Sequence, residues 1–123
     1  MYHKTFYIWT KWPLKEWAAG CAVGPFVFIR QGYENDKGLL EHELCHVKQW
    51  WDNPIHSLQY LMSKKYRLNC EIEAYKVQNQ CYPDDRRWLF AGFIADHYGL
   101  NVSQEEAFKL LMALIIADFC YET

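Results

Sequence analysis

His42, Glu43 and His46 form a His-Glu-x-x-His pattern, in which two histidines bind a metal ion and a glutamate follows the first of them. On a helix, residues four apart lie on one face with Cβ atoms about 6 Å apart, so both imidazoles can reach one Zn²⁺ at about 2.0–2.1 Å. Glu43 lies about 100° around the helix and can reach a metal-bound water. The pattern therefore predicts one zinc ion per chain, with His42 and His46 as ligands and Glu43 as the catalytic residue.

This pattern needs a helix, and the residues from about Lys37 to Trp51 have helical periodicity. Apolar residues recur there at i, i+4, i+7 and i+11, namely Leu40, Leu44, Val47 and Trp51. At about 100° per residue, His42 and His46 point some 120–160° away from this apolar stripe. We therefore expect a helix whose apolar side packs on the core while its histidines face a cleft.

A catalytic zinc with two histidine ligands needs a third protein ligand and leaves its fourth position to water. The downstream candidates are His56, Glu71, Glu73, Asp84, Asp85 and His97. Glu71 lies on the flank of the packed face of a helix predicted from about Arg67 to Gln80, whereas Glu73 points away from that face. A carboxylate on a packed face is costly unless it is paired or metal-bound. Glu71 is therefore the predicted third ligand, and Glu73 is the alternative, which we expect in solvent.

Two strands are predicted before the histidine helix. The segments from Thr5 to Trp9 and from Phe26 to Gln31 are rich in aromatic and β-branched residues. Pro25, at the start of the second segment, is typical of an edge strand. Between the strands, the residues from Pro13 to Ala19, followed by Gly20, indicate one or two helical turns. We expect a small N-terminal β-sheet whose edge strand packs on the histidine helix.

Three or four further helices are predicted after the histidine helix. They cover the segment with Ile55, Leu58 and Met62, the segment from Arg67 to Gln80 with or without a break before it, Arg86 to Tyr98, and Ser103 to about Cys120. Asn53 and Pro54 are typical of an N-cap and a first helical residue. Ser103 and Glu106 have the spacing of a capping box. The predicted fold class is α+β and mostly helical.

Length and composition limit the classes of protein. A chain of 123 residues that is 51% hydrophobic is expected to form one domain with a core that needs no disulfide. The net charge is −2 and no basic stripe is visible, so nucleic acid is not an expected partner. The longest apolar run, Leu110 to Ile116, is too short to span a bilayer.

The five cysteines, at positions 21, 45, 70, 81 and 120, include no Cys-x-x-Cys pair. Free thiols in a reducing compartment are the simplest interpretation of that pattern. The N-terminus also lacks the apolar region of a secretory leader. We therefore expect a cytoplasmic protein.

The motif from His42 to His46, followed 25 residues later by Glu71-x-Glu73, resembles the gluzincin clan of zinc metallopeptidases. The single-domain minigluzincins are closest in size, and the similarity covers roughly Phe26 to Gln80. The resemblance implies a zincin-like metallopeptidase domain over residues 1–123. It also implies that Glu71 is the third zinc ligand.

The activity that this resemblance implies is hydrolysis of a peptide or protein substrate. Zinc lowers the pKa of its water towards about 7 and polarises the scissile carbonyl. Glu43 then takes the proton from the water and passes it to the leaving amine. An extended peptide would add to the edge of the strand from Phe26 to Gln31. Tyr75, Tyr66 and His56 are candidates for stabilising the oxyanion.

Two other classes of protein stay open. One is a zinc-stabilised binding or structural module of a larger assembly, although a purely structural site has no use for Glu43 and would close its fourth position. The other is a zinc-free helical interaction protein, in which the motif is accidental. The apolar stripe of the last helix, from Leu110 to Phe119, could also form a homodimer face. Cys45 is expected to be a core-flanking thiol, with inhibition of the zinc as the alternative.

Overall fold

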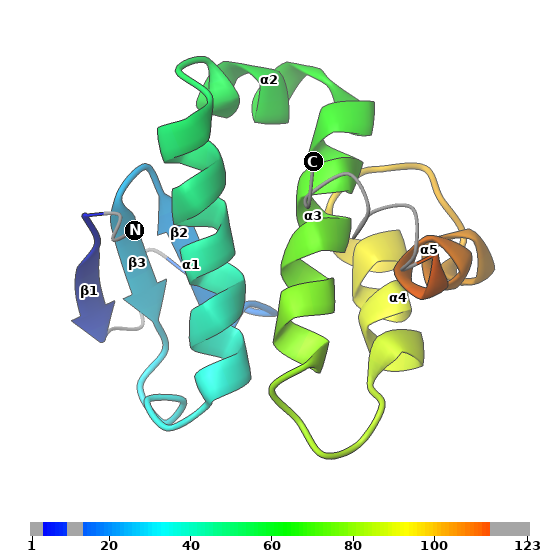
Figure 1. The fold of residues 1–123 in the computed structure, drawn as a ribbon, viewed down its shortest axis with the longest axis horizontal. Coiled ribbons are helices and arrows are strands. Elements are labelled where there is room, and N and C mark those ends of the chain that lie inside the picture. Colours follow the sequence, from blue (N-terminus) through cyan, green and yellow to red (C-terminus); the bar gives the residue numbers. More distant parts are fainter. Residues whose placement is uncertain (1–3, 10–13, 114–123) are drawn as a thin grey trace.

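The computed structural model describes residues 4–9 and 14–113 (Figure 1). Three strands come first: β1 (Phe6–Trp9), β2 (Gly20–Val23) and β3 (Phe26–Ile29). The helices in the described part of the chain are α1 (Lys37–Asp52), α2 (His56–Met62), α3 (Lys64–Asn79), α4 (Arg87–His97) and α5 (Gln104–Met112). The predicted fold class, a mostly helical α+β protein with a small N-terminal sheet, is confirmed.

The helix predicted to contain the two histidines is α1, and its bounds agree with the prediction to within one residue. Asp36 is the N-cap, and its carboxylate accepts a hydrogen bond of 3.0 Å from the backbone N–H of Leu39. The predicted apolar stripe is wrong in part, because Trp51 is 46% exposed and Leu39 packs in the core instead. The cause is that α1 lies between the sheet and α3, and so buries two of its sides (Figure 1).

The three strands form one sheet in the order β1-β3-β2. β1 pairs with β3 in parallel, from Phe6 opposite Phe26 to Trp9 opposite Ile29. β2 pairs with the other side of β3 in antiparallel register. The prediction that the Phe26–Gln31 strand is an edge strand is therefore wrong, because neighbours occupy both of its sides. The strand at the edge next to α1 is β2.

The helical turns predicted from Pro13 to Ala19 are wrong for the described residues 14–19. These residues contain a turn, in which the backbone N–H of Ala18 donates to the carbonyl of Lys15 at 2.9 Å, and the chain then enters β2. Arg30 holds this turn, because its Nε donates to the Ala18 carbonyl and its Nη2 to the Lys15 carbonyl. β2 consists mostly of small residues with weak strand preference, so its conformation depends on pairing with β3.

The connection from α1 to α3 differs from its prediction in one respect. Asn53 does not cap α2: its Oδ1 accepts from the backbone N–H of Ile55 at 3.1 Å, in a turn that precedes the helix. The helix itself begins at His56. A break at Ser63 then separates α2 from α3, and the Ser63 hydroxyl caps α3 by accepting from the N–H of Tyr66.

At the C-terminal end the capping box is confirmed. The N–H of Ser103 donates to the Glu106 carboxylate at 3.1 Å, and the N–H of Glu106 donates to the Ser103 hydroxyl at 3.0 Å. The helix after it, α5, is shorter than predicted, because Ala113 has a non-helical backbone. Residues 114–123 lie outside the described part, and so does most of the stripe predicted as a homodimer face.

Two apolar clusters lie on either side of the α1–α3 pair. The first lies between the sheet and α1 and contains Val27, Ile29, Leu39 and Val47. The second joins α3, α4 and α5 and contains Ile72, Tyr75, Phe90, Ala91, Ile94, Leu100, Ala107 and Leu111. Figure 1 shows α1 and α3 side by side between these two regions, with α2 joining them at one end. One cluster therefore fixes the position of α1 and the other fixes that of α3, and together they position the residues that lie between these two helices.

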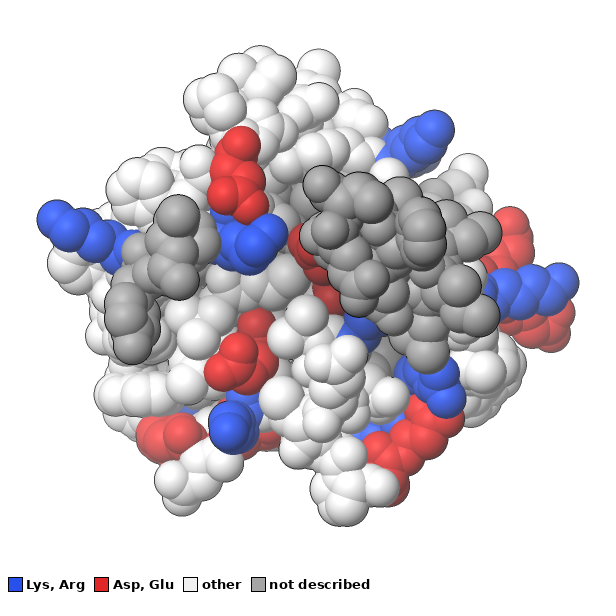
Figure 2. Space-filling view, in the orientation of Figure 1, with Lys and Arg blue, Asp and Glu red and all other residues white. Residues whose placement is uncertain are grey.

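The structure also describes surface charges, cysteines and the helices that could be compared with a membrane span. Figure 2 shows basic and acidic side chains interspersed on the visible face. None of the four cysteines in the described ranges is in a disulfide, namely Cys21, Cys45, Cys70 and Cys81, while Cys120 lies outside those ranges. Among the helices that the structure describes, none combines the length and the apolar character needed to cross a membrane.

Candidate metal centre

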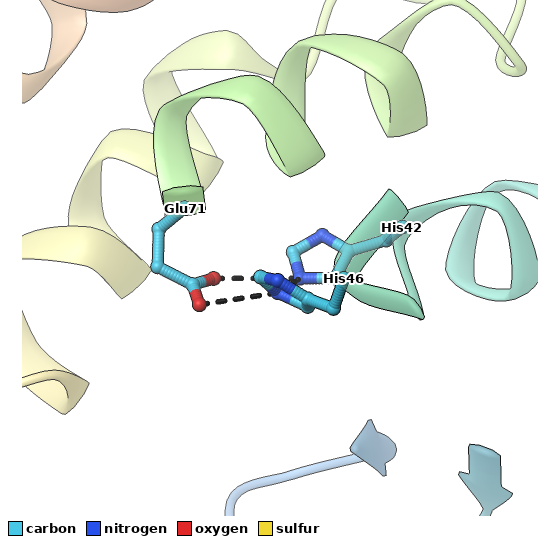
Figure 3. A group of neighbouring side chains, drawn as sticks. All are labelled: His42, His46 and Glu71. Atoms are coloured by element: carbon cyan, nitrogen blue, oxygen red, sulfur yellow. Dashed lines mark hydrogen bonds and ion pairs between the residues drawn. The ribbon is translucent and has the colours of Figure 1, made fainter. Parts of the chain in front are cut away.

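His42, His46 and Glu71 converge between α1 and α3 (Figure 3). The two Nε2 atoms of the histidines lie 3.2 Å apart. Nε2 of His42 is 3.4 Å from Oε1 of Glu71, and Nε2 of His46 is 3.1 Å from Oε2. In a tetrahedral site with ligands about 2.0–2.1 Å from zinc, neighbouring ligand atoms are about 3.3 Å apart. The three side chains therefore have the spacing of ligands around one small cation, and this buried group could hold a metal ion.

The elements explain why these side chains meet. His42 and His46 lie one turn apart on α1, and Glu71 lies on the side of α3 that packs against α1. Glu71 is only 1% exposed, which agrees with its predicted position near the packed face. The prediction that Glu73 lies in solvent is wrong, because this residue is partly buried and its Oε1 accepts a hydrogen bond of 2.7 Å from Gln49. The ligand role of Glu71 stays a prediction.

The other sequence candidates for the third ligand lie outside this group. Asp84 and Asp85 form exposed ion pairs with Arg86 and Arg87. His97 stacks on Trp17 with ring centroids 4.3 Å apart, and the Nδ1 of His56 lies 2.7 Å from the Tyr66 hydroxyl. Each of these four candidates therefore has its contacts with residues other than His42 and His46.

When no metal is bound, His46 and Glu71 each shift the pKa of the other. Burial by itself would raise the pKa of Glu71, but the charge of His46 and the close contacts of both imidazoles with the carboxylate hold it well below its usual range. Burial by itself would lower the pKa of His46, but the Glu71 charge outweighs it and raises this pKa to about 9. At neutral pH the metal-free site is thus a buried ion pair, in which a proton occupies the position that a metal would take.

Two buried polar atoms of the group have no hydrogen-bond partner, namely Oε1 of Glu71 and Nδ1 of His42. A buried carboxylate oxygen without a partner costs about 1–3 kcal/mol or more. A cation between the two histidines would give Oε1 that partner. Two imidazoles and one carboxylate are also a common ligand set of catalytic zinc, so the residues present fit this metal.

Glu43 lies beside the group without belonging to it. Its carboxylate packs against Gly20 of β2, where an added Cβ would lie 3.2 Å from Oε2 of Glu43. Burial raises the pKa of Glu43, although the charges of His42 and His46 oppose this effect. A carboxyl whose pKa is moved towards neutrality is suited to taking and giving a proton. Its position on the cleft side of α1 is the one that the motif predicts for a proton-transfer group.

A cleft of about 810 Å³ opens over His42, Glu43, His46 and Glu71. Residues from β2, α2, α3, the end of α4 and the turn before β2 complete its wall, among them Trp17, Gly20, Ala22, His56, Tyr60 and Arg67. Of the three predicted oxyanion candidates, only His56 is among the lining residues. The Tyr75 ring instead packs edge-on against His42, with centroids 4.4 Å apart.

Tyr60 is a residue of the site that the sequence did not predict. It lies four residues after His56 on α2, lines the cleft, and donates a hydrogen bond of 2.5 Å from its hydroxyl to Oε2 of Glu71. The four-residue spacing from His56 is a weak local signal for a shared helix face. Its approach to Glu71 depends on how α2 folds over α3, which no local pattern reveals.

Comparisons of the chain with protein-family models, with curated proteins and with solved structures found no match. The gluzincin resemblance consequently depends on the motif residues alone. What the site can do has to be argued from its own geometry and charges.

Proposed function

We propose that this protein is a zinc-dependent metallopeptidase in which His42, His46 and Glu71 bind the metal and Glu43 is the general base. One observation carries the proposal. The Nε2 atoms of His42 and His46 lie 3.1–3.4 Å from each other and from the nearest carboxylate oxygens of Glu71, as metal ligands would. Glu43 lies beside them at the floor of an open cleft. A purely structural zinc site would have a fourth protein ligand and no need for an adjacent carboxylate.

In this proposal, bound zinc supplies a Lewis acid for the scissile carbonyl and an acidified water. Glu43 removes a proton from the attacking water and delivers it to the leaving amine. Its raised pKa makes both transfers easier near neutral pH. His56 lies on the cleft wall, where a ring N–H can donate to the developing oxyanion, and the Tyr66 hydroxyl at its Nδ1 fixes the orientation of the ring.

The free edge of β2 supports a peptide as the substrate. The N–H of Arg30 donates to the carbonyl of Ala19, so hydrogen-bonded pairs with β3 fall on alternate residues, next at Cys21 and Val23. The backbone groups of Gly20 and Ala22 then face the other side of β2, which no described strand covers and which borders the cleft. An extended peptide can add to this edge through backbone hydrogen bonds.

A zinc-stabilised binding module is the second candidate. The exposed apolar residues of α2 and the turn before it favour it, since Ile55, Leu58, Leu61 and Met62 are 54–75% exposed. Exposed apolar surface of this kind is typical of a contact with another protein. The open cleft beside Glu43 still favours the enzyme, because a binding module does not need a path from solvent to the metal.

A comparison of the wild type with Glu43→Gln separates the two functions. Both proteins are purified without added metal, their zinc content is measured, and cleavage of a quenched fluorescent peptide library is followed. We expect one zinc in each protein and a rate about 10²–10⁴-fold lower in Glu43→Gln. Equal inertness of two zinc-containing proteins would support the binding module. Absence of metal from the wild type, even after zinc addition, would exclude both functions.

A further inference from the structure

Gln49 lies on α1 one turn after His46, and both ends of its side-chain amide have partners. Its Oε1 is 2.8 Å from Nδ1 of His46. Its Nε2 donates to Oε1 of Glu73 at 2.7 Å and to the backbone carbonyl of Cys70 at 3.1 Å. Gln49 is buried, so these contacts are shielded from water.

These partners determine the orientation of the Gln49 amide. A carboxylate and a backbone carbonyl can only accept, so the NH₂ group of Gln49 must face Glu73 and Cys70. The carbonyl oxygen of Gln49 must then face His46, and Nδ1 of His46 must carry a hydrogen to donate to it. When a metal replaces the second proton the ring is neutral and keeps one N–H, so the lone pair of His46 is on Nε2, the atom that faces His42 and Glu71.

We propose that Gln49 and Glu73 form a positioning relay for the metal site. Gln49 fixes the tautomer and ring orientation of His46, and Glu73 acts through Gln49 by fixing its amide. This inference depends on metal binding by His42, His46 and Glu71, but not on peptidase activity. It gives Glu73 a role that differs from that of Glu71, although the two carboxylates lie two residues apart on α3.

His42 has no comparable support among the described residues. Its Nδ1 is buried without a hydrogen-bond partner, and the Tyr75 ring packs against it. The two histidines are therefore positioned by different means, His42 by packing and His46 by hydrogen bonds. Loss of the relay should weaken metal binding through His46. Removing the hydrogen-bond partner of a ligand histidine typically lowers metal affinity 10–100-fold.

A structural role for Gln49, as a polar link between α1 and α3, makes a different prediction. Its loss would lower the melting temperature of the metal-free and zinc-bound proteins equally and leave the zinc affinity of the folded protein unchanged. The relay predicts that the zinc affinity falls, and that zinc raises the melting temperature less than in the wild type.

The test compares four variants with the wild type by competition with a chromophoric zinc chelator at one pH. Gln49→Leu removes the acceptor for His46, and we expect affinity to fall 10–100-fold. Glu73→Leu removes one acceptor of the Gln49 amide and leaves the Cys70 carbonyl and the Cys45 sulfur, so a smaller loss of roughly 3–10-fold is expected. Glu73→Gln keeps an acceptor oxygen without the charge and should stay within about threefold. Glu105→Gln changes an exposed residue of α5 and controls for the same change in charge.

Two outcomes would overturn the relay. One is a Gln49→Leu protein that is folded and binds zinc within twofold of wild type. The other is a loss in Glu73→Gln as large as that in Glu73→Leu, because the charge and not the orientation of Gln49 would then matter. If the wild type itself binds no zinc, the proposed function fails first, and the melting temperatures show whether Gln49 is only structural.

A spectroscopic measurement tests the tautomer directly. In zinc-bound protein with ¹⁵N-labelled histidine, the Nδ1–H of His46 should give a slowly exchanging resonance, because it is buried and hydrogen-bonded to Gln49. In Gln49→Leu this protection should be lost, while the resonances of His42 change little. Unchanged protection at His46 in a folded Gln49→Leu protein would contradict the relay.

Discussion

The hydroxyl of Tyr60 lies 2.5 Å from Oε2 of Glu71 and donates a hydrogen bond to it across the α2–α3 junction. The two oxygens of this carboxylate therefore have different environments. Oε2 faces Tyr60 and His46, whereas Oε1 is buried without a hydrogen-bond partner and faces His42. This division favours Oε1 as the atom that would bind a metal, with Tyr60 holding the orientation of the carboxylate.

Tyr60→Phe should weaken metal binding without unfolding the protein. The phenyl ring keeps the packing on α2, but Glu71 loses the donor that fixes its orientation, and zinc affinity should fall by up to about tenfold. Competition with a chromophoric chelator measures the change. Tyr66→Phe is a matched control, because it removes a hydroxyl that contacts His56 and not Glu71. Equal affinities of Tyr60→Phe and wild type would contradict the role of this hydrogen bond.

The stability of the metal-free protein should depend on pH through His46. Its pKa is raised from 6.5 to about 9, so its protonation stabilises the fold fully below pH 6.5, and this contribution is lost as the pH rises through 9. We expect the melting temperature measured with a chelator to fall between pH 6.5 and 9. In the zinc-bound protein the ring is already neutral, so the decrease should be absent. A constant melting temperature of the metal-free protein across this interval would contradict the His46–Glu71 ion pair.

Zinc affinity should change in the opposite direction over the same interval. Zinc has to displace the proton from His46, so the apparent affinity should rise by up to about tenfold per pH unit from pH 6.5 to 9. Titrations in buffers with different ionisation enthalpies count the protons released. Release of no proton at pH 7 would show that His46 is neutral before metal binds.

Gly20→Ala should lower turnover more than zinc binding. A Cβ at this position would lie 3.2 Å from Oε2 of Glu43 and 3.1 Å from Cδ1 of Ile29, so these side chains have to shift by a few tenths of an ångström, which changes the position of the Glu43 carboxylate in the cleft. We expect a rate roughly 10–100-fold lower, within the range that a proton-transfer group contributes. Gly92→Ala on α4 is the control, since its Cβ would meet only the end of the Gln104 side chain. Wild-type rates in Gly20→Ala would argue against this position of Glu43.

Ala22→Pro tests the substrate edge of β2. Proline removes the N–H that faces away from β3, and it is tolerated on an edge strand where that N–H is not part of the ladder. Loss of one backbone hydrogen bond should raise KM roughly 2–10-fold, which corresponds to about 0.5–1.5 kcal/mol. Zinc content and melting temperature should stay near those of wild type. An unchanged KM in the folded variant would mean that peptides bind elsewhere in the cleft.

Sequence reasoning was most successful where the signal is local. The bounds of α1, the capping box at Ser103 and the position of Glu71 near the packed face of α3 all follow from spacing along one helix. It failed at β2, whose small residues have no strand pattern of their own. It also failed at Glu73, because its partner Gln49 lies on another helix.

The sequence by itself determined the motif of His42, Glu43 and His46 and the helix that carries it, because helical spacing is set by the chain's own geometry. Only the tertiary structure decided that β2 and not β3 is the open edge, and which carboxylate of α3 meets the two histidines. Those features depend on how α1 and α3 pack and on the pairing of strands distant from each other. Such contacts are selected by burial of the whole core, which no local pattern contains.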